Sequence, residues 1–294
     1  MQDTAGVKIG SKWGYINKKG EAIIKQSYNW CGNFSRFLTA VLVGKKWGYV
    51  DHDGVMLIKP QFDEAYEFTK DLALVRIGNK WGYIVDTGDM IISPYGYENA
   101  FSFSESSGLA AVKQNNQWGF IDTLGKMVIK PQFDGVTTFS EGVAAAYIGG
   151  KCGYINEKGN FVINPQFEEA NNFSEGLASV KKDGKWGFID KKGKFLIEPI
   201  FDQAGGFVNG LAWWVNEYDW GYIDKKGKVV WKLKPEGKED TTKKDDVKKK
   251  VLEALEELDN ELNLVKDMDG IELEGGKVVV NPDAEEWKSA GNIQ

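Results

Sequence analysis

Short alternating runs of apolar and polar residues, separated by turns, fill most of the chain. Leu177–Lys181 and Trp186–Asp190 each have the period-two alternation of a strand. The glycine-containing turn Lys191–Gly193 then joins the second strand to a third, Lys194–Ile197, in a hairpin. Pro199 is expected to end the pairing, because it has no N–H to donate to a ladder. Helical spacing is absent from this stretch, which is therefore predicted to be all-β.

Trp-Gly pairs recur at a nearly constant interval along the same stretch. The spacings are 34, 34, 37, 34, 34 and 34 residues, and the long interval reflects three extra residues in the third copy. One of these lies within Pro94–Tyr97 and two lie at Ser106–Ser107. Seven units of about 34 residues, each predicted to be a three-stranded β-meander, span residues 7–233. The pairs begin at Trp13, Trp47, Trp81, Trp118, Cys152 (in place of Trp), Trp186 and Trp220.

The glycine of each pair lies in mid-strand, as in Trp47-Gly48-Tyr49. Glycine weakens a strand there unless something approaches its backbone closely, so we expect a side chain or backbone of a neighbouring unit to pack over it. One unit is too small to bury its own aromatic residues, and stacked units must share a continuous core. The units are expected either to stack as an open β-superhelix or to close into a propeller-like ring.

The full repeat reads Lys-Trp-Gly-Tyr/Phe-Ile-Asp, then Gly-Lys, Ile-x-Pro-Gln-Phe-Asp and Phe-Ser-Glu-Gly-Leu-Ala. Over about four-fifths of the chain it resembles the bacterial WG-repeat (KWG-type) family. The resemblance implies β-strand repeats that mediate binding, and it brings no catalytic residues. The copies depart from the pattern at Cys152, at Val85 in the Asp/Asn position and at Gln26-Ser27 in place of Pro-Gln.

The composition changes after residue 233. A polar linker is expected over 234–244, followed by an acidic segment over 245–294 that contains one helix and a β-hairpin. The hairpin is predicted from Ile271–Leu273 and Val278–Val280 around a Gly-Gly turn. The helix either caps the open end of the repeats or docks a partner. Its apolar residues recur at steps of 4, 3, 4 and 3: Val251, Leu255, Leu258, Leu262 and Val265.

Composition excludes several classes of function. His52 is the single histidine, so a Ser-His-Asp or Cys-His centre could use no other and a His-rich metal site is impossible. Cys31 and Cys152 do not make a disulfide framework in 294 residues. We expect no cofactor, no metal and no catalytic residues. No run of about 18 apolar residues occurs, so no membrane span is expected.

Charge is distributed unevenly. The formal net charge of −6 argues against general affinity for nucleic acid. Residues 236–294 hold 9 Lys and 17 Asp or Glu, so the acidity belongs to the tail and the repeats are nearly neutral. Lysines on the hairpin turns would line one edge of a regular array. They either hold an acidic partner, an anionic glycan or the chain's own acidic tail, or they keep exposed turns soluble. These lysines are Lys18, Lys19, Lys158, Lys191, Lys192, Lys225 and Lys226.

Aromatic residues that break the repeat are the candidate binding surface. The regular Trp column is interpreted as shared core, because it recurs in almost every unit. Trp30 instead stands where other units have Glu64, Glu169 or Gln203, and is expected to face water. Trp213 replaces small or aliphatic residues, and exposed aromatics of this kind mark binding surfaces. The complete candidate set is Trp30, Tyr95, Phe101, Trp213 and Trp214.

These patterns predict a non-enzymatic repeat scaffold of bacterial type that binds another macromolecule. A protein partner is favoured, and a cell-envelope glycan is the alternative, since aromatic platforms also bind sugar rings. Met1–Thr4 lacks the basic-then-apolar pattern of a signal peptide, and a protein that had lost its leader would begin in the same way. The sequence is therefore compatible both with the cytoplasm and with export to the cell envelope.

Overall fold

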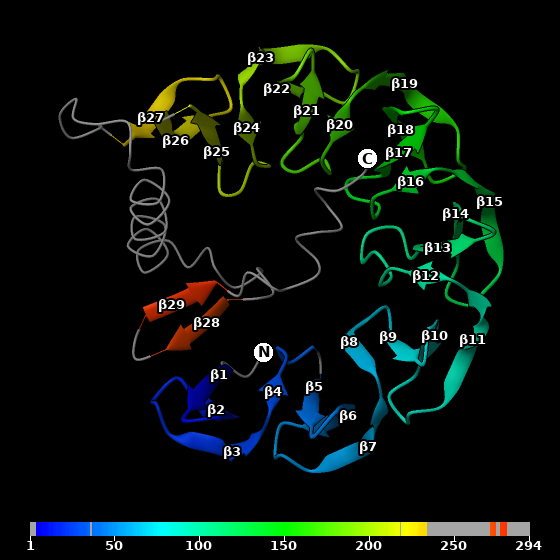
Figure 1. The fold of residues 1–294 in the computed structure, drawn as a ribbon, viewed down its shortest axis with the longest axis vertical. Helices are drawn as coiled ribbons and strands as arrows, with labels where there is room; N and C mark the ends of the chain where they lie inside the picture. Colours follow the sequence, from blue (N-terminus) through cyan, green and yellow to red (C-terminus); the bar gives the residue numbers. More distant parts are fainter. Residues whose placement is uncertain (1–3, 36, 218, 234–270, 275–276, 281–294) are drawn as a thin grey trace. The chain divides into compact units, whose positions relative to one another are not determined.

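The computed structural model describes residues 4–35, 37–217, 219–233, 271–274 and 277–280. The chain divides into two compact units, Met1–Lys234 and Pro235–Gln294. In the first unit, seven antiparallel sheets follow one another in chain order, from β1 to β27 (Figure 1). We number these sheets 1 to 7. None of the described residues forms a helix that could cross a membrane.

Every sheet contains the three-stranded meander predicted from the sequence, and sheets 2 to 7 add a fourth strand before it. Sheet 1 consists of β1 (Thr4–Ile9), β2 (Lys12–Asn17) and β3 (Ala22–Tyr28). Sheet 2 consists of β4 (Trp30–Cys31), β5 (Leu38–Val43), β6 (Lys46–Asp51) and β7 (Met56–Phe62). Sheet 3 consists of β8 (Glu64–Thr69), β9 (Leu72–Ile77), β10 (Lys80–Ile84) and β11 (Met90–Tyr97). Sheet 4 consists of β12 (Asn99–Ala100), β13 (Ala110–Gln114), β14 (Gln117–Ile121) and β15 (Met127–Phe133).

The last three sheets repeat the same order of strands. Sheet 5 consists of β16 (Gly135–Val136), β17 (Val143–Ile148), β18 (Lys151–Asn156) and β19 (Phe161–Phe167). Sheet 6 consists of β20 (Glu169–Ala170), β21 (Ala178–Lys182), β22 (Lys185–Ile189) and β23 (Phe195–Phe201). Sheet 7 consists of β24 (Gln203–Ala204), β25 (Leu211–Asn216), β26 (Asp219–Asp224) and β27 (Val229–Lys232).

A bulge in the outer strand explains the proline of the repeat. In sheet 6, Phe188 pairs with Ile197 and Trp186 pairs with Phe201, so two residues of β22 span the same length as four of β23. Pro199 lies inside this bulge, where no ladder hydrogen bond is required of it. The expectation that Pro199 ends the pairing is therefore wrong, since the strand continues to Phe201.

The same bulge explains the glycine of the Trp-Gly pair in sheets 2, 4, 5 and 6. A Cβ on Gly187 would lie 2.6 Å from the carbonyl oxygen of Ile197 and 2.7 Å from the nitrogen of Pro199. Both atoms belong to the outer strand of the same sheet. The expectation that a neighbouring unit covers this glycine is therefore wrong, because the outer strand of its own unit does so.

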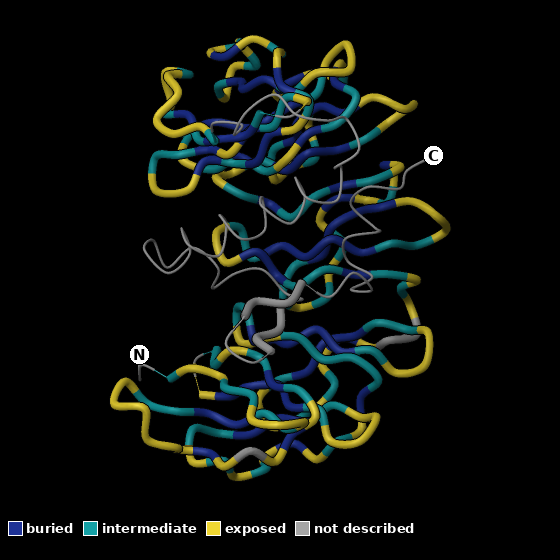
Figure 2. Tube along the Cα trace, turned by 60° about the vertical axis from the view of Figure 1, so that its left-hand side comes forward, coloured by how far each residue is buried: buried dark blue, intermediate teal, exposed yellow. Residues whose placement is uncertain are grey.

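The core lies between successive sheets. We call the side of a sheet that packs on the next sheet its forward face, and the opposite side its rear face. On the forward face of sheet 5, Tyr154 and Phe167 pack against Phe173 and Val180 on the rear face of sheet 6. Five further clusters of the same kind lie between the remaining pairs of neighbouring sheets, from sheets 1 and 2 to sheets 6 and 7. Figure 2 shows the buried segments running along the strands, with exposed residues at the turns.

The regular Trp residues contribute to this core, as the repeat predicts. Trp118 is buried, whereas Trp47 and Trp186 are half-buried and pack against the clusters of their sheets. Cys152, which replaces Trp in the fifth unit, is fully buried. A thiol is a small apolar group, so it fits a position that lies within the shared core.

Serine and tyrosine hydroxyls connect each sheet to the next. The Ser140 hydroxyl donates a hydrogen bond of 2.7 Å to the carbonyl oxygen of Phe173, which lies 33 residues further on. Ser104 and Ser174 make the equivalent bonds, to Phe139 and Phe207. Because donor and acceptor always run from one sheet to the following sheet, we call this bond the forward latch. Tyrosines at the core add similar bonds, such as the 2.7 Å bond from the Tyr154 hydroxyl to the Asn171 carbonyl.

Two of the turn lysines form ion pairs with glutamates of the preceding sheet, so the turn lysines do not all contribute to a free basic stripe. Lys191 lies 3.1 Å from a carboxylate oxygen of Glu141, and Lys225 lies 2.8 Å from Glu175. The Lys225 ammonium group holds the pKa of the Glu175 carboxyl below its usual range. These two lysines therefore neutralise acidic groups of the array at its sheet-to-sheet junctions.

The second unit is described over two strands. β28 (Ile271–Glu274) and β29 (Lys277–Val280) form an antiparallel pair in which Ile271 is opposite Val280. This confirms the predicted hairpin. The predicted linker and the acidic helix, with its apolar residues from Val251 to Val265, lie outside the described residues.

Candidate functional site

The structure separates the five candidate aromatics instead of bringing them together. Trp30 is half-buried, with its ring 5.0 Å from that of Trp13, so the expectation that it faces water is wrong. Phe101 is half-buried against Trp118, between sheets 4 and 5. Trp214 is buried on the rear face of sheet 7, where it contacts Phe201. The side chain of Tyr95 lies outside the described part of the chain.

Trp213 is the candidate that the structure exposes, because it lies on the forward face of sheet 7. It pairs with Tyr222, just as Ala145 pairs with Tyr154 in sheet 5. The residues at the position equivalent to Trp213 in sheets 2 to 6 are at most 3% exposed, whereas Trp213 is 40% exposed. The difference arises because each earlier sheet is covered by the next one. Within the described residues, no core cluster covers the forward face of sheet 7.

Two further aromatic residues extend the surface from Trp213. Tyr222 on β26 is opposite both Trp213 on β25 and Trp231 on β27, so the three side chains form a row across the sheet. Trp231 is 37% exposed, although the isoleucine at its position in sheets 1 to 6 is never more than 7% exposed. Beneath them, the buried Trp220 ring lies 4.9 Å from that of Trp231. We call Trp213, Tyr222 and Trp231 the terminal aromatic face.

A glycine holds the Trp213 indole in place. Gly205 donates its N–H to the Trp213 carbonyl at 3.1 Å; sheets 4, 5 and 6 have Phe101, Thr137 and Asn171 at this position, and sheet 2 has Gly32. A Cβ on Gly205 would overlap the indole nitrogen of Trp213. The indole therefore lies directly on the backbone of Gly205, which fixes its orientation while its other side remains accessible. A side chain ordered in advance loses less conformational freedom on binding.

The forward latch also stops at this sheet. The latch position is Ser35, Ser104, Ser140 and Ser174 in sheets 2, 4, 5 and 6, Thr69 in sheet 3, and Val208 in sheet 7, where the side chain is half-exposed. Valine has no hydroxyl to donate, so sheet 7 lacks the polar connection that the serines of sheets 2, 4, 5 and 6 provide. Together with the indoles of Trp213 and Trp231, this makes its forward face chemically different from the sheet-to-sheet interfaces.

The described side chains with raised pKa values are buried thiols and tyrosine hydroxyls. Burial raises the pKa of the Cys31 thiol to about 11 and that of Cys152 to about 12, so both thiols are protonated at neutral pH. Burial also raises the pKa of the Tyr222 hydroxyl, which stays neutral. The ring of His52 stacks on Phe34 at 4.0 Å.

Sequence analysis did not single out Tyr222 and Trp231. Tyr222 occupies a regular aromatic column, so nothing in the residue type distinguishes it. Trp231 stands where six sheets have isoleucine, and this break in the pattern could have identified it.

Comparison with known proteins identifies the repeat. The family model described as WG containing repeat matches residues 13–47, 47–81, 81–118, 118–152, 153–186, 186–214 and 220–234. No curated protein sequence matches the chain. Among solved structures, the chain is similar to one titled crystal structure of the eukaryotic initiation factor. The two are 11% identical with a TM-score of 0.53, over 80% of this chain and 74% of that chain.

Two other solved structures are similar at lower TM-scores. Kluyveromyces lactis Hsv2 is 9% identical with a TM-score of 0.49, over 79% of this chain and 95% of that chain. Dihydro-heme d1 dehydrogenase NirN in complex with DHE is 12% identical with a TM-score of 0.49, over 80% of this chain and 64% of that chain. Identities this low indicate the fold alone, which is all-β and propeller-like. Because the matched repeats cover most of residues 13–234, the chain belongs to the family of WG-containing repeat proteins.

Proposed function

We propose that this chain is a non-catalytic scaffold that binds a protein partner through the terminal aromatic face. The observation that carries the proposal is the exposure of Trp213 and Trp231 at positions that sheets 2 to 6 bury. Tryptophan and tyrosine dominate the binding energy of protein interfaces, because a large rigid ring buries much area at little entropic cost. The backbone of Gly205 beneath Trp213 adds preorganisation.

The test is a pull-down from host lysate with the full chain and the double variant Trp213→Ala, Trp231→Ala. Removing one hot-spot tryptophan typically costs about 2 kcal/mol or more, which weakens binding by about 30-fold. The matched control is Val230→Ala, because Val230 is an exposed residue on the same strand as Trp231. A protein captured by the wild type and the control, but not by the double variant, supports the proposal. Equal capture by the double variant contradicts it.

The same aromatic row has the chemistry of a sugar-binding platform, which keeps a cell-envelope glycan as the second candidate. Retention of the chain by insoluble cell-wall material, with no protein captured, would favour the glycan over a protein. An affinity that grows with glycan length would point the same way, because longer chains reach several equivalent subsites.

A further inference from the structure

The rear face of sheet 1 has the residues of an internal junction, although no core cluster of the described residues covers it. Val7 stands at a position that holds valine in sheets 2, 3, 4 and 6. The position of Ile16 is completely buried in sheets 2 to 7, whereas Ile16 is half-buried and its pairing partner Ala5 is exposed. The end units of repeat proteins need a polar outer face for solubility. An apolar rear face on the first sheet therefore indicates a surface that another sheet covers.

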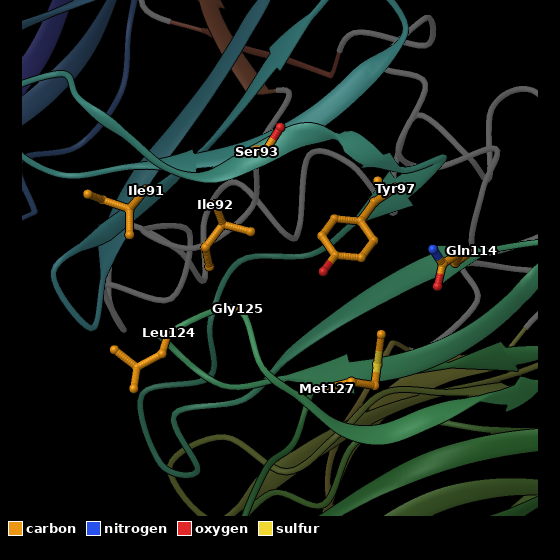
Figure 3. Close-up of a pocket in the computed structure, with 9 residues that line it drawn as sticks. Ile91, Ile92, Ser93, Tyr97, Gln114, Leu124, Gly125 and Met127 are labelled. Carbon is orange, nitrogen blue, oxygen red and sulfur yellow. The ribbon is translucent and has the colours of Figure 1, made fainter.

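Each internal junction contains a contact between an isoleucine and a glycine. The isoleucine lies on the outer strand of one sheet, and the glycine lies, with a positive φ, in the turn before the outer strand of the next sheet. A Cβ on Gly125 would lie 3.3 Å from Ile92. Figure 3 shows Ile92 pointing from β11 towards Gly125 across the junction of sheets 3 and 4. The pairs are Ile24 with Gly54, Ile58 with Gly88, Ile92 with Gly125, Ile129 with Gly159, Ile163 with Gly193 and Ile197 with Gly227.

The two ends of the array hold the two unmatched halves of this pair. Gly20 stands at the glycine position of sheet 1 with a φ of 77°, and a Cβ on it would meet nothing within 4 Å. Trp231 stands at the isoleucine position of sheet 7, opposite Tyr222, and is 37% exposed. Sheet 1 thus has an uncovered turn glycine, and sheet 7 has a large apolar side chain at the position that covers such a glycine elsewhere.

Internal junctions also use the short strand that sheets 2 to 7 add before the meander. The loop after this added strand brings a phenylalanine onto the forward face of the preceding sheet, with ring centroids 4.8 to 5.1 Å apart. Phe173 packs on Tyr154 in this way, and its carbonyl accepts the forward latch from Ser140. Sheet 1 has no added strand among the described residues. It would therefore bring neither this ring nor this carbonyl to a face that it covered.

Sheet 7 differs from the earlier sheets at the positions that contact the added strand. Val208 replaces the latch serine, so the forward face of sheet 7 requires no phenylalanine carbonyl. Ala145, at the position of Trp213, belongs to the core cluster that contains Phe173. The indole of Trp213 thus supplies aromatic bulk where the incoming ring would be missing. The forward face of sheet 7 is therefore suited to a sheet that has no added strand, which is the form of sheet 1.

The two uncovered faces belong to opposite ends of one series of sheets. No strand of sheet 1 pairs with a strand of sheet 7, and none of the core clusters in the described part of the chain contains residues of both. Each face is thus left uncovered by the other within one copy, whereas two copies can bring them together. Such a contact repeats the forward-to-rear packing that the chain already uses between its own sheets.

We propose that the terminal aromatic face binds the rear face of sheet 1 in a second copy of this chain, so that copies join head to tail. The proposal rests on the function proposed above and names the protein partner. Trp231 covers Gly20 of the second copy, and Trp213 faces the apolar surface around its Val7. The contact joins different faces of the two copies, so each dimer keeps one face of each kind and can add further copies.

Sedimentation velocity of the purified full chain over a range of concentrations tests the proposal. We expect the wild type to form dimers and longer oligomers as its concentration rises. Ala5→Lys blocks the rear face of sheet 1, and the double variant Trp213→Ala, Trp231→Ala removes most of the terminal aromatic face. Ala5 is exposed, so the lysine should not disturb the fold. Each variant alone should stay monomeric up to concentrations about tenfold above those at which the wild type associates.

Mixing the two variants tests the head-to-tail arrangement itself. Ala5→Lys keeps its terminal aromatic face and the double variant keeps its sheet 1 face, so an equimolar mixture should form dimers and nothing longer. Ile23→Lys is the matched control and should associate as the wild type does. It adds the same charge to sheet 1, at a position that stays exposed within the array at Val128, Val162 and Leu196.

Three results would overturn the proposal: a wild type that is monomeric at every concentration, an Ala5→Lys variant that associates as the wild type does, or a mixture of the two variants that stays monomeric. A monomeric wild type that still captures a host protein through Trp213 and Trp231 overturns this inference and leaves the proposed function standing. Capture of a host protein equally by the wild type and the double variant contradicts the proposed function instead.

Discussion

The glycine of each Trp-Gly pair gives the sharpest test of the fold. In Gly187→Ala the new methyl group would lie 2.6 Å from the Ile197 oxygen, 2.7 Å from the Pro199 nitrogen and 2.8 Å from the Glu198 carbonyl carbon. Ordinary contacts to carbon begin near about 3.5 Å, so the outer strand must retreat by more than half an ångström at three backbone atoms at once. Overpacking of this kind costs about 1–3 kcal/mol, and a backbone obstacle places this case at about 3 kcal/mol.

The sign of the effect makes this test decisive. Without the clash, alanine in mid-strand would stabilise the protein by about 0.5–1 kcal/mol relative to glycine. Urea unfolding followed by circular dichroism measures the difference, with Gly96→Ala as the control, since its methyl group would meet nothing within 4 Å. We expect Gly187→Ala to lower the free energy of unfolding and Gly96→Ala to leave it unchanged or slightly raised. If Gly187→Ala is as stable as the wild type, the outer-strand explanation of the motif is wrong.

Three further predictions concern the hydroxyl bonds between sheets and the buried thiols and tyrosines. Ser140→Ala leaves the Phe173 carbonyl without its hydroxyl donor and should cost about 1 kcal/mol in urea unfolding, while Val208→Ala at the last latch position should stay within about 0.5 kcal/mol. A thiol reagent at pH 8 should label Cys31 and Cys152 only after denaturation, and rapid labelling of the native chain would contradict their burial. Buried thiols and tyrosine hydroxyls have raised pKa values, so the folded chain holds protons that the unfolded chain releases. Stability to urea should therefore be constant between about pH 6 and 8.5, where the carboxyls are ionised and the thiols protonated, and fall as the pH rises past about 10; stability that increased there would refute the assignment.

The sequence predicted the sheets well because each one is specified locally. Alternation and glycine turns set strands such as Trp186–Asp190, and repetition then confirmed them seven times over. The sequence-based explanations of Gly187 and Pro199 were wrong because a bulge depends on how two strands pair. The alternation of residues along one strand does not reveal that pairing. The added strand β20 was missed because it is only two residues long.

The candidate site was predicted in part, since exposure depends on neighbours as well as on residue type. Trp213 was found because its residue type breaks a column. Trp214 follows it directly and therefore faces the opposite side, where sheet 6 buries it. Tyr222 belongs to a column that is buried in every earlier sheet, and it is only half-buried because of its place in the last sheet. No feature of that residue alone could have shown this.

The forward latch bears on how the array folds. Its donor and acceptor are 33 to 35 residues apart. Among the described residues, the longest polar contacts between sheets join Lys191 to Glu141 and Lys225 to Glu175, each across 50 residues. No step in forming these junctions has to close a loop of more than about 50 residues, so the entropy of bringing distant segments together stays small. Folding can thus begin at any adjacent pair of sheets and spread in both directions, as in other repeat proteins. An array of this kind should acquire its structure faster than a β-protein of equal length whose first and last strands must pair.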